Sequence, residues 1–121
     1  MKVLITGGAG YIGSILVGDL LDREDVELVT VVDNLMYRQV SLSHFMSDPR
    51  FEFILGDVRD ADLMNGLVSE YDVIIPLACI VGMPACSKNT REAVEVNYQA
   101  VADICDLSDA SQKIIFPTTN S

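Results

Sequence analysis

Five short apolar runs alternate along the chain with stretches in which apolar residues recur at helical spacing. The runs are Lys2–Thr6, Leu28–Asp33, Phe51–Leu55, Val73–Leu77 and Ile114–Phe116. Each run is almost continuously apolar, which is typical of parallel strands that are covered on both faces. Strands that alternate with helices predict an α/β fold, a Rossmann-like, doubly wound parallel sheet of about five strands.

Three stretches between the runs carry apolar residues three or four positions apart, which predicts one buried face on each of three helices. The residues of these faces are Ile12, Ile15, Leu16 and Leu20 in the first helix, Leu63, Met64, Leu67 and Val68 in the second, and Val94, Tyr98, Val101 and Cys105 in the third. Asp60 is suited to cap the second helix, and the third helix is expected to begin near Thr90.

Four glycines, Gly7, Gly8, Gly10 and Gly13, lie between the first strand and the first helix. Glycine disfavours helix and strand interiors by roughly 0.5–1 kcal/mol relative to alanine, so these glycines need a reason. A flexible tight turn is one reason. The spacing also fits G-x-G-x-x-G from Gly8 and G-x-x-G-x-x-G from Gly7, and the next strand ends in an acidic residue. This context favours a dinucleotide site with the phosphates at the helix N-terminus.

Asp33 is that acidic residue, twenty positions after Gly13. Its carboxylate is placed to accept hydrogen bonds from an adenosine ribose, and it would repel a 2′-phosphate, so NAD is favoured over NADP. Arg38, five positions on, is the feature that speaks for NADP. The alternative is that Asp33 only caps a loop.

The formal net charge of −10 argues against nucleic acid and against an anionic membrane surface as partners, because both ask for a basic face. No apolar stretch approaches the roughly 18 residues of a membrane span, and the N-terminus does not resemble a signal peptide. Cys79, Cys86 and Cys105 lack metal-ligand spacing and are expected as buried free thiols in the cytoplasm. His44 is the single histidine, and no metal site is expected.

The segments TGGAGYIGS, VVDNL, GDVRD, PLACIVG and VNYQA follow one another along the chain. With this ordered set the chain resembles, over essentially its whole length, the extended short-chain dehydrogenase/reductase family. These are the NAD-dependent epimerases and dehydratases that act on nucleotide sugars. The resemblance implies NAD as the cofactor and a nucleotide sugar as the substrate of the complete enzyme.

The resemblance also implies which residues contact the cofactor. They are Gly7, Gly10, Tyr11, Ile12 and Gly13 at the pyrophosphate, Asp33 with Asn34 and Leu35 at the adenosine ribose, Asp57 and Val58 at the adenine edge, and Leu77, Ala78 and Cys79 beside the nicotinamide ribose. Asp57 has the alternative role of an acid at a helix N-terminus. Cys79 stands where the family usually has alanine and is expected to serve packing, and Asn97 matches a residue that is more often structural than catalytic.

The last segment, IIFPTTNS, matches the family's fifth strand and its Ser/Thr triplet. By this match, Thr119 is the residue that bonds the reacting sugar hydroxyl. Asn120 and Ser121 stand where several 4,6-dehydratases have Asp-Glu, which favours epimerase, decarboxylase or reductase chemistry. In the family, the base is a tyrosine with a lysine four positions later. No tyrosine of this sequence has a lysine at that spacing; the tyrosines are Tyr11, Tyr37, Tyr71 and Tyr98.

Residues 1–121 are therefore expected to be the NAD-binding Rossmann domain of a longer enzyme. The chain would be truncated before the sixth strand and the C-terminal substrate domain, and inactive alone. The alternative is a stand-alone, non-catalytic nucleotide-binding module. A reading frame that continues into G-x-x-Y-x-x-x-K would favour the first hypothesis. Both hypotheses are compatible with a homodimer.

Overall fold

Five parallel strands form one sheet in the order β3-β2-β1-β4-β5. The structure is a computed structural model that describes residues 1–118, with the backbone alone for residues 83–85. The strands are β1 (Lys2–Thr6), β2 (Leu28–Asp33), β3 (Phe51–Leu55), β4 (Val73–Pro76) and β5 (Lys113–Ile114). The predicted Rossmann-like fold class is thereby confirmed, and the first three strands have the predicted bounds.

The fifth strand is shorter than predicted and shifted by one residue. It pairs with β4 through Val73 with Lys113 and Ile74 with Ile114, and the N–H of Ile115 still donates to the carbonyl of Ile74 at 2.9 Å. Pro76 is the next β4 residue that faces this edge. It has no N–H to donate, so the ladder cannot continue along the predicted Phe116.

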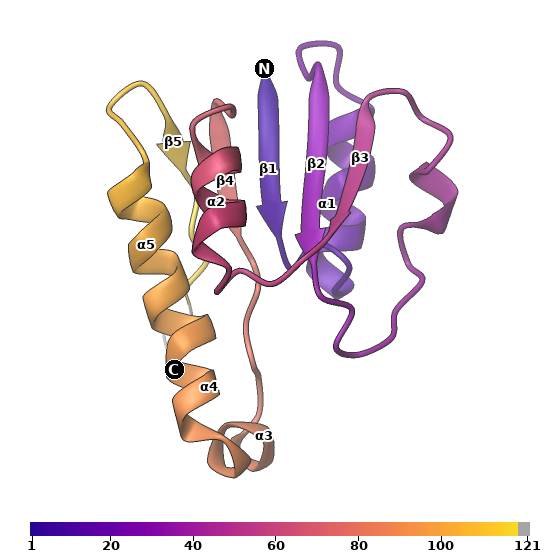
Figure 1. Cartoon of the computed structure of the whole chain (residues 1–121). Helices are drawn as coiled ribbons and strands as arrows, with labels where there is room; N and C mark the ends of the chain where they lie inside the picture. The colour runs from indigo at the N-terminus through magenta and orange to yellow at the C-terminus, as the bar shows by residue number, and fades with distance from the viewer. Residues whose placement is uncertain (119–121) are drawn as a thin grey trace.

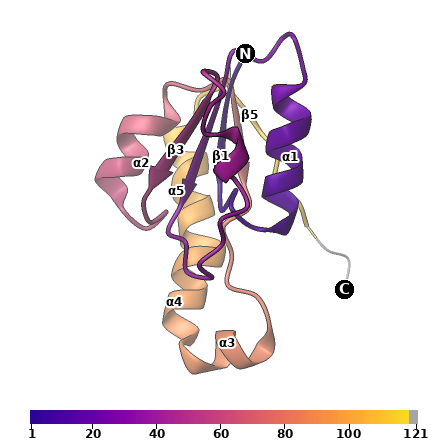
Figure 2. The ribbon, with the colours of Figure 1, turned by 90° about the vertical axis from the view of Figure 1, so that its right-hand side faces the viewer.

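The helices cover both faces of the sheet. They are α1 (Tyr11–Leu21), α2 (Ala61–Val68), α3 (Met83–Lys88), α4 (Thr90–Val94) and α5 (Ala100–Leu107), with a 3-10 turn η1 (Ser43–Phe45) and a π-helical turn η2 (Glu95–Gln99). Helix α1 lies on one face, and α2 and α5 lie on the other (Figures 1 and 2). Within residues 1–118, no helix has the length and apolar content needed to cross a membrane.

Two cores form on the two faces because neighbouring side chains of a strand point in opposite directions. On the α1 face, Val3 and Ile5 of β1 pack with Val17 of the helix. On the other face, Leu4 of β1 packs with Ile104 of α5, among other residues. A third, smaller cluster joins the loop after β3 to α4 and η2, below the strand ends.

The predicted face of the second helix is confirmed, whereas that of the first is confirmed at Leu16 and Leu20, which pack against the core, and wrong at Ile12 and Ile15. Met64 and Val68 of α2 are buried, and the Asp60 carboxylate caps this helix by accepting the N–H of Leu63 at 3.1 Å. In α1 the buried residues are Gly13, Val17 and Leu21. Ile12 and Ile15 are 63% and 53% exposed. The buried face of α1 contains Gly13, because only a residue without a side chain fits against the backbone of Gly8.

The third predicted helix begins at Thr90 as expected and runs without a break through η2 into α5. Its buried face is nevertheless formed by Ala93, Val96, Ala100 and Ile104. Val94 and Tyr98, from the predicted face, are 54% and 69% exposed. The helix has two apolar faces, and the one with alanines lies inward, because small side chains allow a close approach to the loops beneath it.

Candidate cofactor-binding site

A cavity of about 690 Å³ opens at the carboxyl ends of the strands. Loops that follow all five strands contribute to its wall. It is lined by every cofactor-binding residue implied by the resemblance except Leu35, namely Gly7, Gly10, Tyr11, Ile12, Gly13, Asp33, Asn34, Asp57, Val58, Leu77, Ala78 and Cys79. Ligand sites of open α/β sheets form at this edge, where the chain direction of neighbouring crossovers reverses.

Leu35 lies beside this cavity rather than in it. It lines a separate cavity of about 220 Å³ together with apolar residues of the segment that leads to β3. Its backbone is left-handed, with φ 53°, and its side chain packs against the core under α1. The backbone turn that carries Leu35 away from the cavity was not visible in the sequence pattern.

Three of the four loop glycines are required by packing. Gly7 has φ 71°, and a Cβ on it would lie 2.5 Å from the backbone of Ala78. A Cβ on Gly8 would lie 2.8 Å from the side chain of Val31 in β2, and one on Gly13 would lie 2.5 Å from the backbone of Gly8. Gly8 therefore packs on the sheet, and Gly13 packs on Gly8.

Gly10 differs from its three neighbours. The closest atom to a Cβ on Gly10 is the carbonyl oxygen of Gly7 at 3.4 Å, an ordinary contact distance. Its backbone, with φ −71° and ψ 178°, is open to any residue. The protein's own packing therefore gives no reason for a glycine here, whereas the cavity beside it does.

The first turn of α1 presents unpaired backbone donors to the cavity. Gly10 occupies the cap position and supplies no side-chain acceptor. Among the hydrogen bonds of residues 1–118, none uses the N–H of Tyr11, Ile12 or Gly13. Such N–H groups and the positive end of the helix dipole favour an anionic group at this place.

Asp33 is fixed by two backbone donors. Its carboxylate accepts the N–H of Ala9 at 3.0 Å and the N–H of Leu35 at 2.8 Å, one on each oxygen. Asp33 therefore does cap the loop, as the alternative interpretation expected. A carboxylate oxygen can accept two hydrogen bonds, so each oxygen keeps one acceptor position. The side chain lines the cavity, which leaves the ligand role open beside the capping role.

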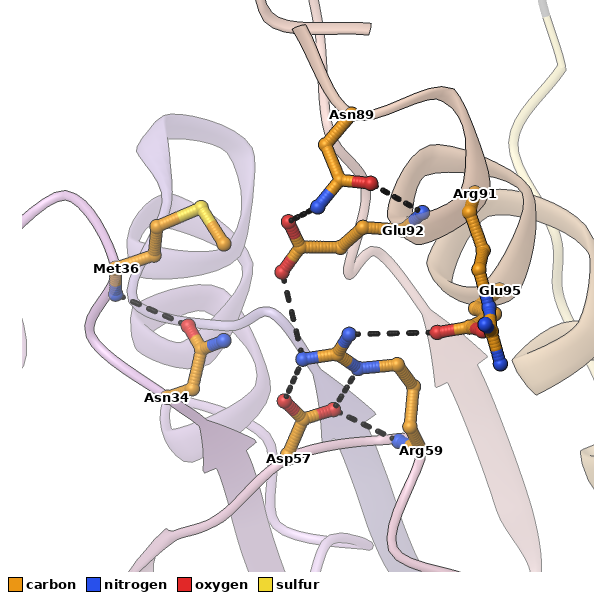
Figure 3. Close-up of polar contacts among 8 residues, drawn as sticks. All are labelled: Asn34, Met36, Asp57, Arg59, Asn89, Arg91, Glu92 and Glu95. Atoms are coloured by element: carbon orange, nitrogen blue, oxygen red, sulfur yellow. Dashed lines mark hydrogen bonds and ion pairs between the residues drawn. The ribbon is translucent and has the colours of Figure 1, made fainter.

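Asp57 lies in the loop after β3, two residues beyond Leu55, and forms a two-pronged ion pair with Arg59 (Figure 3). Its Oδ1 accepts the backbone N–H of Arg59 at 2.9 Å and the Nε of Arg59 at 3.0 Å, and its Oδ2 accepts the Nη2 at 2.7 Å. These hydrogen bonds hold the pKa of the Asp57 carboxyl below its usual range, against the opposing effect of partial burial. The carboxylate is thus ionised and held in one orientation.

The wall on the β4 side is fastened by Asn97 of η2. Its Oδ1 accepts the N–H of Ile80 at 2.7 Å, and its Nδ2 donates to the carbonyl of Ile80 at 2.9 Å. Asn97 holds the loop that carries Cys79, which agrees with the structural role expected for Asn97.

The expected burial of the three thiols is wrong, because Cys79 and Cys105 are exposed and Cys86 is half-buried.

The sequence model of the NAD dependent epimerase/dehydratase family matches residues 3–121. The chain belongs to this family. The predicted family and its cofactor, NAD, are thereby confirmed.

Members with different reactions are similar to this chain. A dTDP-glucose 4,6-dehydratase of Actinoplanes sp. is 41% identical over 85 residues, which are 64% of this chain and 27% of that protein. UDP-glucuronic acid decarboxylase 3 of Arabidopsis thaliana is 39% identical over 121 residues, which are 100% of this chain and 34% of that protein. The chain spans between about a quarter and a third of the length of these two relatives.

A solved structure of the family shows the same fold. It is the crystal structure of a UDP-glucuronic acid 4-epimerase from Bacillus cereus in complex with UDP-glucuronic acid and NAD. It is 26% identical and matches with a TM-score of 0.86 over 100% of this chain and 41% of that chain.

In this member of the epimerase/dehydratase family, the cavity also has lining residues that the sequence reasoning did not single out as ligand contacts. They are Val32, Met36, Tyr37, Gln39, Gly56, Pro76, Ile80, Val81, Val96, Asn97, Phe116, Pro117 and Thr118. Most follow the end of a strand, and that position was the available signal, since parallel strands end at one edge. Thr119, the predicted contact to the sugar, lies outside the described residues.

Proposed function

We propose that this chain is the NAD-binding portion of a nucleotide-sugar epimerase/dehydratase-like oxidoreductase. One observation carries the proposal. Tyr11, Ile12 and Gly13, whose N–H groups are unpaired within residues 1–118, line one cavity of about 690 Å³ at the carboxyl edge of the sheet together with Asp33 and Asp57. An acidic protein can bind the two phosphates of NAD in this way without a basic patch.

The strand order supports one orientation of the cofactor. With the pyrophosphate at α1, which follows β1, the ribose beside Asp33 lies over β2. The adenine then extends toward the loop after β3, and the nicotinamide lies on the other side, over the loop after β4. In this orientation Asp57 faces the base, and Cys79 faces the nicotinamide half.

The loop after β3 offers a pattern that complements adenine. Adenine presents a donor at N6 and an acceptor at N1 along one edge. Among the hydrogen bonds within residues 1–118, Oδ2 of Asp57 accepts only the Nη2 of Arg59, although the amide of Asn34 also approaches this carboxylate, and none uses the N–H of Val58. The Val58 side chain is buried, so its backbone is the part available to a ligand. An acceptor next to a donor matches the N6 and N1 edge.

Asp33 supports NAD rather than NADP, because its carboxylate would repel a 2′-phosphate. Arg38 does not line the cavity, and its left-handed backbone, with φ 54°, belongs to a turn in which its N–H bonds the carbonyl of Leu35. Calorimetric titration of the 121-residue chain is expected to show tighter binding of NAD than of NADP. Tighter binding of NADP, or no binding of NAD, would overturn the proposal.

The reaction of the complete enzyme is proposed only as a class. The similar proteins carry the names of a dehydratase, a decarboxylase and an epimerase, all of nucleotide sugars. We propose a nucleotide sugar as the substrate. We also propose no turnover by these 121 residues alone, since none of their tyrosines has the lysine four positions later. A cytoplasmic location and a homodimer stay predictions.

A further inference from the structure

Arg59 joins two parts of the cavity wall that are far apart in the sequence. It follows Asp57 in the loop after β3, and its guanidinium also lies 3.4 Å from Glu92 and 3.5 Å from Glu95 (Figure 3). Glu92 lies on α4, and Glu95 begins the π-helical turn. One cation therefore ties the loop that faces the base to the helix beside it.

The two acidic partners of Arg59 are themselves held in place. The amide of Asn89 donates to the Glu92 carboxylate at 3.0 Å and accepts the backbone N–H of Glu92 at 3.2 Å. Nε of Arg91 donates to the Glu95 carboxylate at 2.8 Å. The helix side thus presents two fixed acceptors, and they limit where the guanidinium of Arg59 can lie.

Arg59 also decides how Asp57 can meet a ligand. The backbone N–H and Nε of Arg59 fill both acceptor positions of Oδ1, whereas Nη2 fills one of the two on Oδ2. Among the hydrogen bonds within residues 1–118, the acceptor position of this carboxylate that Arg59 leaves vacant is on Oδ2, and the side-chain amide of Asn34 also approaches the carboxylate. A planar guanidinium fork fixes the plane of the carboxylate, which an ammonium group cannot do.

We propose that Arg59 is a positioning residue that gives the site its selectivity for adenine, by holding Asp57 so that Oδ2 accepts the exocyclic amine of the base. The inference rests on the proposed function, since it needs NAD in the cavity. The inference assigns a role in cofactor selectivity to a residue that does not itself contact the cofactor. Arg59 acts through Asp57, and Glu92 and Glu95 hold Arg59.

The test compares NAD with nicotinamide hypoxanthine dinucleotide, which has a carbonyl in place of the amine. The carbonyl oxygen of hypoxanthine would face Oδ2 of Asp57, and neither atom can donate a hydrogen bond to the other. The wild-type chain is therefore expected to bind NAD about tenfold or more tighter than the hypoxanthine dinucleotide. Arg59→Lys keeps the charge and loses the fork. Calorimetry should show this preference reduced about threefold to tenfold in Arg59→Lys and in Arg59→Met.

The chain offers a matched control in Arg23. This residue forms the same kind of two-pronged pair with Asp25, at 2.9 and 2.7 Å, away from the cavity. Arg23→Lys is expected to leave the preference unchanged. Asp57→Ala should reduce the preference to the part that the N–H of Val58 supplies at N1, and adding Arg59→Lys to that variant should change it no further.

The outcomes separate this inference from the proposed function. An Arg59→Lys variant that keeps the wild-type preference for NAD would overturn the inference, and equal losses of affinity for both dinucleotides would show a role in folding alone. A wild-type chain that binds both dinucleotides equally would also overturn the inference, while leaving NAD binding intact. A wild-type chain that binds neither would overturn the proposed function itself. Circular dichroism checks the fold of each variant, and Glu92→Gln, which keeps the fork and removes one anchor, provides a milder change.

Discussion

Two walls of the cavity, the loop after β1 and the loop after β3, are built in different ways. The glycine loop after β1 uses backbone packed at contact distance, with Gly7 against Ala78 and Gly13 against Gly8. The loop after β3 uses a network of partly exposed charges centred on Arg59. Close packing tolerates almost no added atom, whereas exposed ion pairs contribute little stability and are weakened by salt. The first wall is thus fixed by shape and the second by charge.

Gly7→Ala is the strongest way to break the first wall. Its Cβ would lie 2.5 Å from the Ala78 backbone, and the residue has φ 71°. The clash and the left-handed backbone together should lower the free energy of unfolding by about 2–5 kcal/mol. Urea unfolding followed by circular dichroism measures the change.

Gly66→Ala is the matched control for this substitution. Gly66 lies in α2, and a Cβ added to it would meet no atom within 4 Å apart from its chain neighbours and the backbone of its own helix. Alanine there should stabilise the protein by roughly 0.5–1 kcal/mol, the ordinary difference in a helix interior. A Gly7→Ala variant as stable as Gly66→Ala would contradict the packing account of the loop.

Gly10→Val separates ligand approach from packing within the same loop. The nearest protein atom leaves room for a side chain, so the fold should remain. The valine would project into the cavity and block the approach of the pyrophosphate to the α1 N–H groups. Loss of two charge-assisted hydrogen bonds corresponds to a fall in NAD affinity of about a hundredfold or more. A folded variant that binds NAD as tightly as the wild type would show that the phosphates lie elsewhere.

The second wall should respond to pH, whereas the first should not. Because Arg59 lowers the folded-state pKa of Asp57, the pair stabilises the protein above the unfolded-state pKa, about 3.9, and this contribution is lost as the pH falls through the folded-state value. Asp57→Asn should therefore reduce stability at pH 7, by less than about 1 kcal/mol for so exposed a pair, and by less at pH 3.

Urea midpoints of Asp57→Asn and wild type at the two pH values provide the measurement. Using the difference between variant and wild type cancels the other carboxylates whose pKa is lowered, such as Asp25 and Asp109. The corresponding difference for Gly7→Ala should stay constant. A pH-independent effect at Asp57 would remove the electrostatic distinction between the walls.

The contrast between the walls also explains which parts were predictable from the sequence. The strands and the glycine loop follow from local pattern, because a buried parallel strand is apolar throughout and glycines clustered between a strand and a helix indicate a turn or a close approach to the backbone. The pair of Arg59 and Glu95 joins residues 36 positions apart, and no local pattern reports it.

The errors have the same origin. Helical spacing predicts Ile12, Ile15, Val94 and Tyr98 inside, yet which of two apolar faces is buried depends on the partner that the helix meets. The end of β5 depends on Pro76 in another strand, and the place of Leu35 depends on a left-handed turn. Each is a tertiary fact that the spacing of residues along the chain does not contain.

If the proposed function is correct, both walls contact one bound NAD, with the phosphates at α1 and the base at the loop after β3. Titration of the 15N-labelled chain with NAD, followed by amide chemical shifts, tests it directly. We expect the largest shifts at the amides of Tyr11, Ile12 and Gly13 and, at the same NAD concentration, at Val58. Shifts at α1 without any at Val58, or shifts confined to other parts of the chain, would contradict it.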